Sequence, residues 1–182
     1  MNKCELRKHL KSKRSEMEIS EVEKKSTAIC THLINSDIFK NASVIMLYLP
    51  IKNEVDTKLL TEKAFSDGKT VLVPHTEADK IYPVILKKTD TLIPEAYNIK
   101  EPEEKIIREE KIDLCIVPGV GFDIKGARIG FGKGCYDRFF EEHSTKKIGL
   151  AYSFQVTDKI DAEPHDIHMD IIVTEEGLFY CE

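Results

Sequence analysis

Residues 113–140 read DLCIVPGVGFDIKGARIGFGKGCYDRFF, and this stretch decides the fold. Residues 114–117 (LCIV) form a short apolar run, which is typical of a strand buried on both faces. Residues 118–134 then hold six of the chain's nine glycines. Helical spacing follows, with Tyr136, Phe139 and Phe140 at i, i+3 and i+4. A buried strand, a glycine-rich loop and a helix in this order indicate a βαβ unit.

The rest of the chain alternates between strand and helix in the same way. A helix is predicted at residues 2–17, and a second begins at Ser20, because Ser20 and Glu23 have the spacing of a capping box. Pro83 confines a possible strand at 81–86 to a sheet edge, and 89–102 stay unassigned. Further helices are predicted at 57–66 and 134–143, and strands at 43–49, 70–73, 147–151, 171–174 and 178–180. We therefore predict a single α/β domain over residues 1–182, Rossmann-like, with three layers and a mainly parallel central sheet.

The composition excludes several classes of protein. The chain has 182 residues, 41% of them hydrophobic, and a formal net charge of −5, so we expect no nucleic-acid partner. Its five cysteines form no C-x-x-C pair and leave an odd count, which favours a reducing compartment over a disulfide framework. The amino terminus has no apolar signal segment, and no apolar run approaches the roughly 20 residues that span a bilayer. We expect a soluble, cytoplasmic protein without a membrane partner.

Three predicted strands are followed directly by proline, at Leu49-Pro50, Val73-Pro74 and Val117-Pro118. Ligands of open parallel sheets bind beyond the carboxyl ends of the strands. We therefore expect the loop that carries Glu54, the loop at His75 and the glycine-rich loop to share one edge of the sheet.

The glycine-rich loop fits neither of two well-known nucleotide motifs. A Walker A loop has four residues between its first glycine and Gly-Lys, whereas five separate Gly126 from Gly132. The dinucleotide pattern G-x-G-x-x-G fails because Cys135 stands where its last glycine belongs. What remains is a loop with Arg128 and Lys133 that leads into a helix amino terminus, a combination that favours phosphate binding. The alternative is a tight turn with solvated basic residues.

The remaining candidate residues each have a simpler interpretation beside the functional one. Asp137, in the first turn of its helix, either complements the helix dipole or binds Mg²⁺ together with phosphate oxygens. Residues 165–170 (HDIHMD) are either metal ligands or a solvated loop. Cys135 has no histidine at a recognisable spacing, so the pattern does not support a catalytic cysteine. Lys3, Arg7 and Lys11 share one helix face, which taken alone is a solvated surface.

Together these motifs resemble the 5-formyltetrahydrofolate cyclo-ligase family, also called 5,10-methenyltetrahydrofolate synthetases. The similarity runs nearly end to end, and the glycine-rich block at 118–140 is its most specific part. Its other parts are Lys3-x-x-x-Arg7, YLP at 48–50, EVDT at 54–57, VLVP at 71–74, AYSFQ at 151–155, HDxxMD at 165–170 and TE at 174–175.

The resemblance implies an ATP-dependent ligase that forms a carbon–nitrogen bond. It converts 5-formyltetrahydrofolate to 5,10-methenyltetrahydrofolate, uses Mg²⁺ as cofactor, and releases ADP and phosphate. Arg128 and Lys133 are the expected catalytic residues, Leu49 and Glu54 the folate contacts, and Asp137 and Asp170 the metal ligands. The implied ATP-binding residues are Lys3, Arg7, Arg128, Ile129, Gly130, Phe131, Gly132, Lys133, Gly134, Cys135 and Tyr136.

The chain departs from the family pattern at two positions. Cys135 replaces the first tyrosine of the usual Gly-Tyr-Tyr-Asp, so only backbone contacts are expected there, and Gly121 stands where alanine is common. One consequence for the fold is checkable. Asp170 precedes the strand at 171–174, and for it to reach the site that strand has to run antiparallel to the others.

Two other functions are compatible with the same architecture. One is a sugar-phosphate isomerase, which needs no nucleotide, and the other is a folate- or nucleotide-binding module without catalysis. The intact set of Arg128, Lys133, Asp137 and Asp170 argues against the second. We expect a monomer whose only partners are small molecules, ATP and 5-formyltetrahydrofolate.

Overall fold

A seven-stranded sheet forms the centre of the molecule in the computed structural model, which describes residues 2–95, 98–163 and 166–181. Its order is β12-β11-β9-β6-β1-β2-β3. The inner strands are all parallel: β11 (Ile171–Thr174), β9 (Lys146–Leu150), β6 (Leu114–Val117), β1 (Val44–Met46) and β2 (Thr70–Glu77). The antiparallel edges are β12 (Gly177–Tyr180) and β3 (Lys80–Ile85). The predicted α/β class with a mainly parallel sheet is confirmed.

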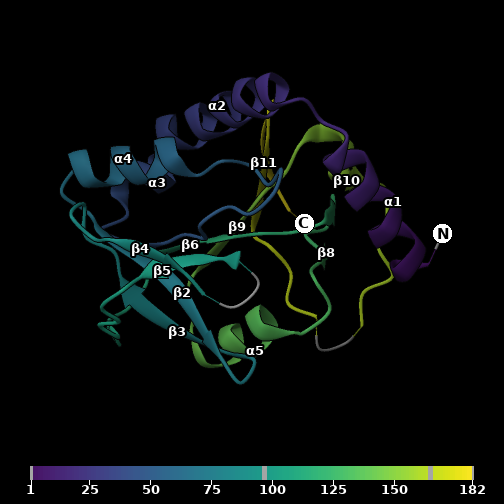
Figure 1. Ribbon diagram of the computed structural model, residues 1–182. Helices are drawn as coiled ribbons and strands as arrows, with labels where there is room; N and C mark the ends of the chain where they lie inside the picture. The colour runs from purple at the N-terminus through teal and green to yellow at the C-terminus, as the bar shows by residue number, and fades with distance from the viewer. Residues whose placement is uncertain (1, 96–97, 164–165, 182) are drawn as a thin grey trace.

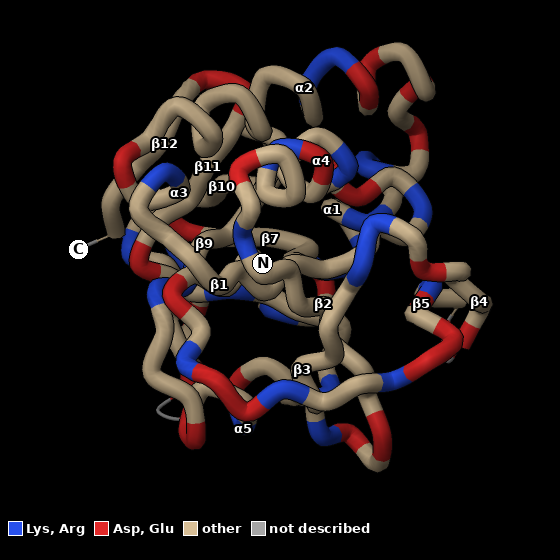
Figure 2. Tube along the Cα trace, turned by 90° about the vertical axis from the view of Figure 1, so that its left-hand side faces the viewer, with Lys and Arg blue, Asp and Glu red and all other residues tan. Residues whose placement is uncertain are grey.

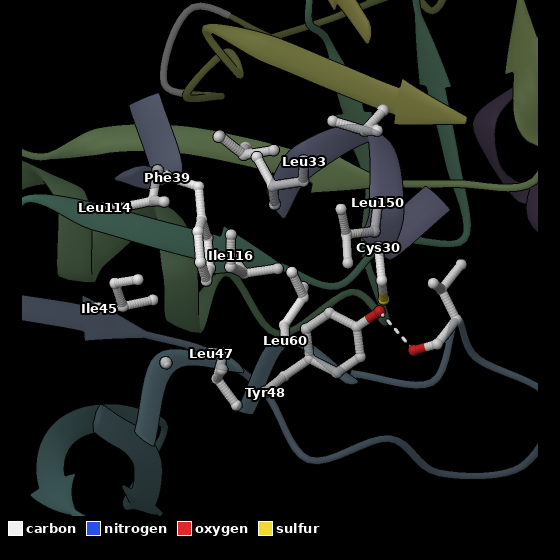
Figure 3. Packing of buried hydrophobic residues seen from close by; sticks show 14 of the residues in the cluster. Cys30, Leu33, Phe39, Ile45, Leu47, Tyr48, Leu60, Leu114, Ile116 and Leu150 are labelled. Atoms are coloured by element: carbon white, nitrogen blue, oxygen red, sulfur yellow. Dashed lines mark hydrogen bonds between the residues drawn. The ribbon is translucent and has the colours of Figure 1, made fainter. Parts of the chain in front are cut away.

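Helices cover both faces of this sheet, which makes the three predicted layers (Figure 1). On one face lie α2 (Ile19–Asn35), α3 (Asp37–Asn41) and α4 (Lys58–Ser66), and on the other lies α5 (Cys135–Glu142). Alternation along β6 serves both faces: Leu114 and Ile116 join the first core, while Cys115 and Val117 join the second. The first core is packed by the branched and aromatic side chains of α2, α3 and the sheet (Figure 3).

The amino-terminal helix α1 (Lys3–Ser15) lies apart from these layers, beside β8 and β10 (Figure 1). A capping box starts it, because the Asn2 side chain accepts from the Glu5 N–H and the Glu5 carboxylate accepts from the Asn2 N–H. Leu10 is its buried anchor and packs in a small third cluster with Val120 and Ile129. The helix therefore docks on the glycine-rich stretch rather than on the main sheet.

The glycine-rich stretch contains strands that the sequence did not predict. β7 (Gly121–Asp123) and β8 (Arg128–Ile129) form a hairpin, and β10 (Val156–Thr157), after the 3₁₀ turn Ser153–Gln155, completes a small sheet. The buried Asp123 carboxylate organises the turn, since it accepts from the N–H groups of Lys125, Ala127 and Ile160. The unassigned region 89–102 holds a second hairpin, β4 (Leu92–Pro94) with β5 (Lys100–Pro102).

Several boundaries differ from those predicted, and the strand predicted at 43–49 is only Val44–Met46. The second helix begins at Ile19 after Glu18, which makes no side-chain cap, so the Ser20–Glu23 capping box is wrong. β2 runs through Pro74 instead of ending before it. It pairs with β1 only as far as Leu72 and continues as a hairpin with β3, where Pro74 faces Pro83 and neither needs to donate to a third strand. The edge position predicted for the strand at 81–86 is confirmed.

Gly149 in β9 leaves room for the ring of Phe122. A Cβ at position 149 would lie 2.5 Å from Phe122 Cε1, and the fully buried ring has nowhere to move. We expect Gly149→Ala to lower the free energy of unfolding by about 1–3 kcal/mol, the usual cost of overpacking a core. Urea denaturation measures this. Combined with Phe122→Leu, the loss should be smaller than the sum of the two single losses, and strict additivity would contradict the contact.

Charged residues of both signs are interspersed along the chain trace (Figure 2). All five cysteines are free thiols. Over the part of the chain that the structure describes, no helix combines the length and the apolar character needed to cross a bilayer.

Candidate functional site

A row of basic residues on α1 lies along the glycine-rich loop. We call Lys3, Arg7, Lys11 and Arg14 the basic stripe. Arg7 Nε donates to the Gly130 carbonyl at 2.9 Å, and Lys11 Nζ lies 4.9 Å from the centre of the exposed Phe131 ring. Lys3 forms an ion pair with Asp166. Burial, with the neighbouring charges of Arg7, Lys52 and Arg14, lowers the pKa of Lys11. The stripe thus concentrates positive charge against the loop, as phosphate binding requires.

The loop itself is shaped by glycine backbone. Gly132 has φ of +99° and Gly134 has φ of +64°, both in a region that residues with a Cβ rarely adopt. Gly134 is also the N-cap of α5 and offers no side chain to the first N–H groups of that helix. Such N–H groups have no partner within the helix and favour an anion. The backbone of the loop and the start of α5 therefore offer N–H groups suited to a phosphate group.

Arg128 connects the start of the glycine-rich stretch to the first turn of α5. Its Nη1 donates to the Pro118 carbonyl at 3.3 Å, and its Nη2 lies 3.3 Å from Asp137 Oδ2. The guanidinium carbon is 5.5 Å from the centre of the Tyr136 ring. The Arg128 side chain is only 8% exposed, and its buried Nε has no hydrogen-bond partner among the described residues. A buried, incompletely satisfied guanidinium is costly, which makes it a candidate for binding a ligand anion.

The tip of the β2–β3 hairpin holds the other side of the loop. Lys133 Nζ lies 3.5 Å from Asp79 Oδ1. Arg138, one turn into α5, donates to the carbonyls of both Lys133 and Asp79, at 2.6 and 3.0 Å. Ala78 and Asp79 have φ of 48° and 61°, as a tight hairpin turn requires. The loop is therefore fixed by α1 on one side and by this hairpin on the other.

Leu49 and Glu54 flank the turn that follows β1. Leu49 is partly buried against the first core, and Glu54 is buried, with Oε2 accepting from the Ile51 N–H at 3.0 Å. The loop is anchored where the Tyr48 hydroxyl donates to the Val55 carbonyl, a bond drawn in Figure 3. Glu54 is close enough to the first turn of α5 for its charge to contribute to the raised pKa of Tyr136, for which burial is the main cause. Arg14 contacts both segments, since its Nη2 lies 3.9 Å from Glu54 Oε1 and its Nη1 donates to the Gly119 carbonyl at 3.3 Å, so the predicted convergence of the Glu54 loop with the glycine-rich stretch is confirmed.

The predicted metal ligands, Asp137 and Asp170, each contact other groups of the chain. β11 runs parallel to β9, so the expectation of an antiparallel strand is wrong. Asp170 precedes β11, and its carboxylate accepts from the Lys147 N–H at 2.7 Å, whereas Asp137 accepts from the Ile167 N–H beside the glycine-rich loop. The described ranges contain no group of three His, Cys, Asp or Glu side chains that could hold a metal ion. His165 lies outside them. The assignment of Asp137 and Asp170 as magnesium ligands stays a prediction.

Among the other predicted positions, Phe131 and Cys135 lie as expected, on the loop and at the start of the helix, whereas Ile129 and His75 lie in strands. Ile129 is buried in β8, and Phe131 is exposed on the loop. Cys135 begins α5 and packs, with Tyr136, against the second core. His75, expected in a loop, lies within β2, with Nδ1 2.6 Å from the buried Glu101 carboxylate.

Two parts of the site were missed in the sequence. Arg14 was not among the candidate site residues, although its position continues the face of Lys3, Arg7 and Lys11. Asp79 carried no recognisable signal, because its contact with Lys133 depends on the length of the β2–β3 hairpin.

Comparison with known proteins agrees with this geometry. The chain matches the 5-formyltetrahydrofolate cyclo-ligase family over residues 1–175. A probable 5-formyltetrahydrofolate cyclo-ligase of Caenorhabditis elegans is 30% identical, over 95% of this chain and 92% of its own. The 5-formyltetrahydrofolate cyclo-ligase of Mycoplasma pneumoniae is 33% identical, over 97% of this chain and 100% of its own.

Solved structures agree in the fold. The 5,10-methenyltetrahydrofolate synthetase of Aquifex aeolicus is similar with a TM-score of 0.89 and 35% identity, over 99% of this chain and 93% of that one. For the 5,10-methenyltetrahydrofolate synthetase of Mycoplasma pneumoniae the TM-score is 0.77 and the identity 29%, over 96% and 99%. The resemblance inferred from the motifs is confirmed, and the chain belongs to the 5-formyltetrahydrofolate cyclo-ligase family.

Proposed function

We propose that this protein converts 5-formyltetrahydrofolate to 5,10-methenyltetrahydrofolate with ATP, and that it releases ADP and phosphate. Family membership supports the reaction. The observation that carries the assignment of the site is the placement of the basic stripe along the glycine-rich loop, with Glu54 beside the same loop. This arrangement offers cations and backbone N–H groups to one ligand and a buried carboxylate to another.

The ATP side consists of the stripe residues Lys3 and Arg7 and the loop from Arg128 to Tyr136. The γ-phosphate would lie between the loop backbone, the start of α5 and the guanidinium of Arg128. Arg128 and Lys133 approach from opposite sides of the loop, and each already neighbours a carboxylate, Asp137 and Asp79 respectively. Those carboxylates keep the two cations in place before the nucleotide arrives.

The chemistry requires activation of the formyl oxygen. That oxygen attacks the γ-phosphorus, an O–P bond forms, and the bond to the β-phosphate oxygen breaks with ADP as leaving group. The N10 nitrogen then attacks the activated formyl carbon and loses its proton, and the C–O bond to phosphate breaks. Phosphoryl transfer of this kind depends on positioning and on cations for the developing charge, which is the role of Arg128 and Lys133.

The folate side consists of Leu49 and Glu54. The partly buried Leu49 offers an apolar surface to a flat ring. Glu54 Oε2 is already occupied by the Ile51 N–H, so Oε1 is the acceptor left for an N–H group of the pterin. Carboxylates accept well from guanidine-like edges of this type.

Magnesium enters this proposal only as the ion that accompanies ATP. Mg²⁺ commonly takes one or two carboxylates together with phosphate oxygens and water, and Asp137 is the carboxylate that lies at the loop. Asp170, the second carboxylate proposed for the ion, also neighbours Lys146 and Lys147 at the start of β9.

A direct assay tests the function. Purified protein, 5-formyltetrahydrofolate and Mg-ATP should produce the absorbance of methenyltetrahydrofolate, with loss of signal when ATP is omitted or EDTA added. Absence of any ATP-dependent product would overturn the proposal. Thermal stabilisation by a sugar phosphate but not by ATP would instead favour the isomerase, and binding of ATP or folate without turnover would favour the non-catalytic module.

We further propose that residues 1–182 act as one domain and as a monomer. The chain of the Mycoplasma pneumoniae relative is covered over its full length, which supports a single functional unit. Five free thiols are most stable in a reducing compartment, so we propose a cytoplasmic location.

A further inference from the structure

Arg14 occupies the junction of three segments that are distant in the sequence. It is only 5% exposed, although it is the last basic residue of α1. Its Nη1 donates to the Gly119 carbonyl at the start of the glycine-rich stretch, at 3.3 Å. Its Nη2 lies 3.9 Å from Glu54 Oε1. Asn53 fixes the backbone around it, since the amide nitrogen donates to the carbonyls of Arg14 and Met17.

The Arg14 and Glu54 side chains lie close together but form no direct hydrogen bond. The two side chains are 6% and 5% exposed, and at 3.9 Å the pair lacks a direct hydrogen bond. Glu54 Oε1 is buried without a hydrogen-bond partner among the described residues. Burying two charges is expensive, and a pair that serves stability alone recovers that cost through close, hydrogen-bonded geometry. An oxygen left open beside a cation is instead ready to accept from a ligand.

We propose that Arg14 is a positioning residue of the cyclo-ligase reaction, which holds Glu54 Oε1 ready for an N–H donor of the folate and ties it to the glycine-rich loop. This inference rests on the proposed function and extends it. Arg14 touches neither reacting group. It acts through Glu54 on the folate side, and its bond to the Gly119 carbonyl holds the guanidinium in place.

Electrostatics give this role a measurable sign. Burial raises the pKa of Glu54, while the bond from the Ile51 N–H and the charges of Arg14 and Lys52 oppose the rise. The other groups facing Glu54 are Tyr48 and Tyr136, whose pKa values burial places well above the ordinary range, so both stay neutral between pH 5 and 9. Removing Arg14 therefore raises the pKa of Glu54 further. The ionised carboxylate is then lost at a higher pH than in the wild type.

Kinetics against pH distinguish this role from a purely structural one. We expect Arg14→Met to move the acid limb of kcat/KM for 5-formyltetrahydrofolate upward by about one pH unit, which is a loss of up to about tenfold on that limb. KM for ATP should change by less than about twofold, because the interaction that Arg14→Met removes serves the binding of the folate and not of ATP. Arg14→Lys should restore most of the acid limb, and Lys8→Met, on the exposed face of α1, should leave it unchanged. An equal loss at every pH, or an equal loss for ATP, would overturn the proposal.

A second measurement does not depend on turnover. In protein labelled with ¹³C at glutamate carboxyls, the Glu54 resonance is assigned by its absence in Glu54→Gln and titrated in the wild type and in Arg14→Met. We expect the midpoint in Arg14→Met to lie about one unit higher, with Arg14→Lys between. Coincident midpoints in folded protein would sink the inference even if the wild type is an active cyclo-ligase. A shifted midpoint in protein without cyclo-ligase activity would locate the failure in the proposed function.

Discussion

Replacing Arg128 by methionine should lower kcat by about 10³-fold or more, the range reported for arginines that stabilise a transferred phosphoryl group. The guanidinium lies beneath the glycine-rich loop, with Nη2 on Asp137 and a buried Nε that has no partner among the residues described. The positive charge of Arg128 is stabilising mainly in the transition state, when negative charge develops on the γ-phosphate. An interaction made mainly in the transition state affects kcat more than KM, so both KM values should change far less.

Two further variants control for indirect effects of this change. Arg128→Lys keeps the charge but loses the planar fork, and we expect an intermediate loss of kcat. Arg108→Met removes an exposed arginine whose only recorded ion pair is with Glu110 at 3.4 Å, and it should leave kcat unchanged. Because Arg128 is largely buried, urea unfolding must show that Arg128→Met remains folded. A folded Arg128→Met enzyme with kcat within tenfold of the wild type would contradict the role assigned to this residue.

Gly126→Ala should produce the largest loss of stability of any single methyl addition in the glycine-rich stretch. Gly126 has φ of +84°, and a Cβ there would lie 2.3 Å from the Met169 carbonyl oxygen. The two backbone segments cannot easily move apart, since the Met169 N–H donates to the Gly126 carbonyl at 2.8 Å. Left-handed backbone strain and the steric overlap together should cost about 3 kcal/mol or more in the free energy of unfolding.

Gly68→Ala separates the two contributions. Gly68, at the end of α4, has φ of +70°, but a Cβ there would meet nothing within 4 Å. Backbone strain alone should cost about 1–2 kcal/mol. Urea denaturation of the two variants gives the steric part as the difference. If Gly126→Ala and Gly68→Ala lower the free energy of unfolding equally, the overlap with the Met169 carbonyl adds nothing and this prediction is wrong.

The central sheet was predictable because its strands are buried on both faces. Residues 113–117 and 171–174 are continuous apolar runs, and such runs require a layer on each side wherever they lie in the sequence. Strand direction was not predictable in the same way. We inferred an antiparallel β11 because Asp170 was expected at the site. In the structure β11 is hydrogen-bonded to β9 and runs parallel to it. The length of β2 likewise depends on its pairing with β3 beyond the end of β1.

In the site, residues with unusual backbone or clustered charge were identified from the sequence, and residues that act through distant partners were not. The glycines at 130–134 and the face of Lys3, Arg7 and Lys11 are local patterns. The helix face of Arg14 could be read from the sequence, but its contacts with the Gly119 carbonyl and the Glu54 carboxylate could not. Those contacts arise from tertiary packing, which no local pattern encodes.

The docking of α1 on the glycine-rich stretch has a consequence for the order of folding. Arg14 meets a carbonyl 105 residues later in the chain, and Arg7 meets one 123 residues later. Contacts at such separations form slowly, because a long loop must close before they contribute. During synthesis α1 can therefore dock only after residues 119–130 have left the ribosome. The layer formed by α2, α3 and α4 can pack on β1 and β2 before that. We expect the core to condense first and the nucleotide side of the site to be completed last, when the earliest segment of the chain finally closes over it.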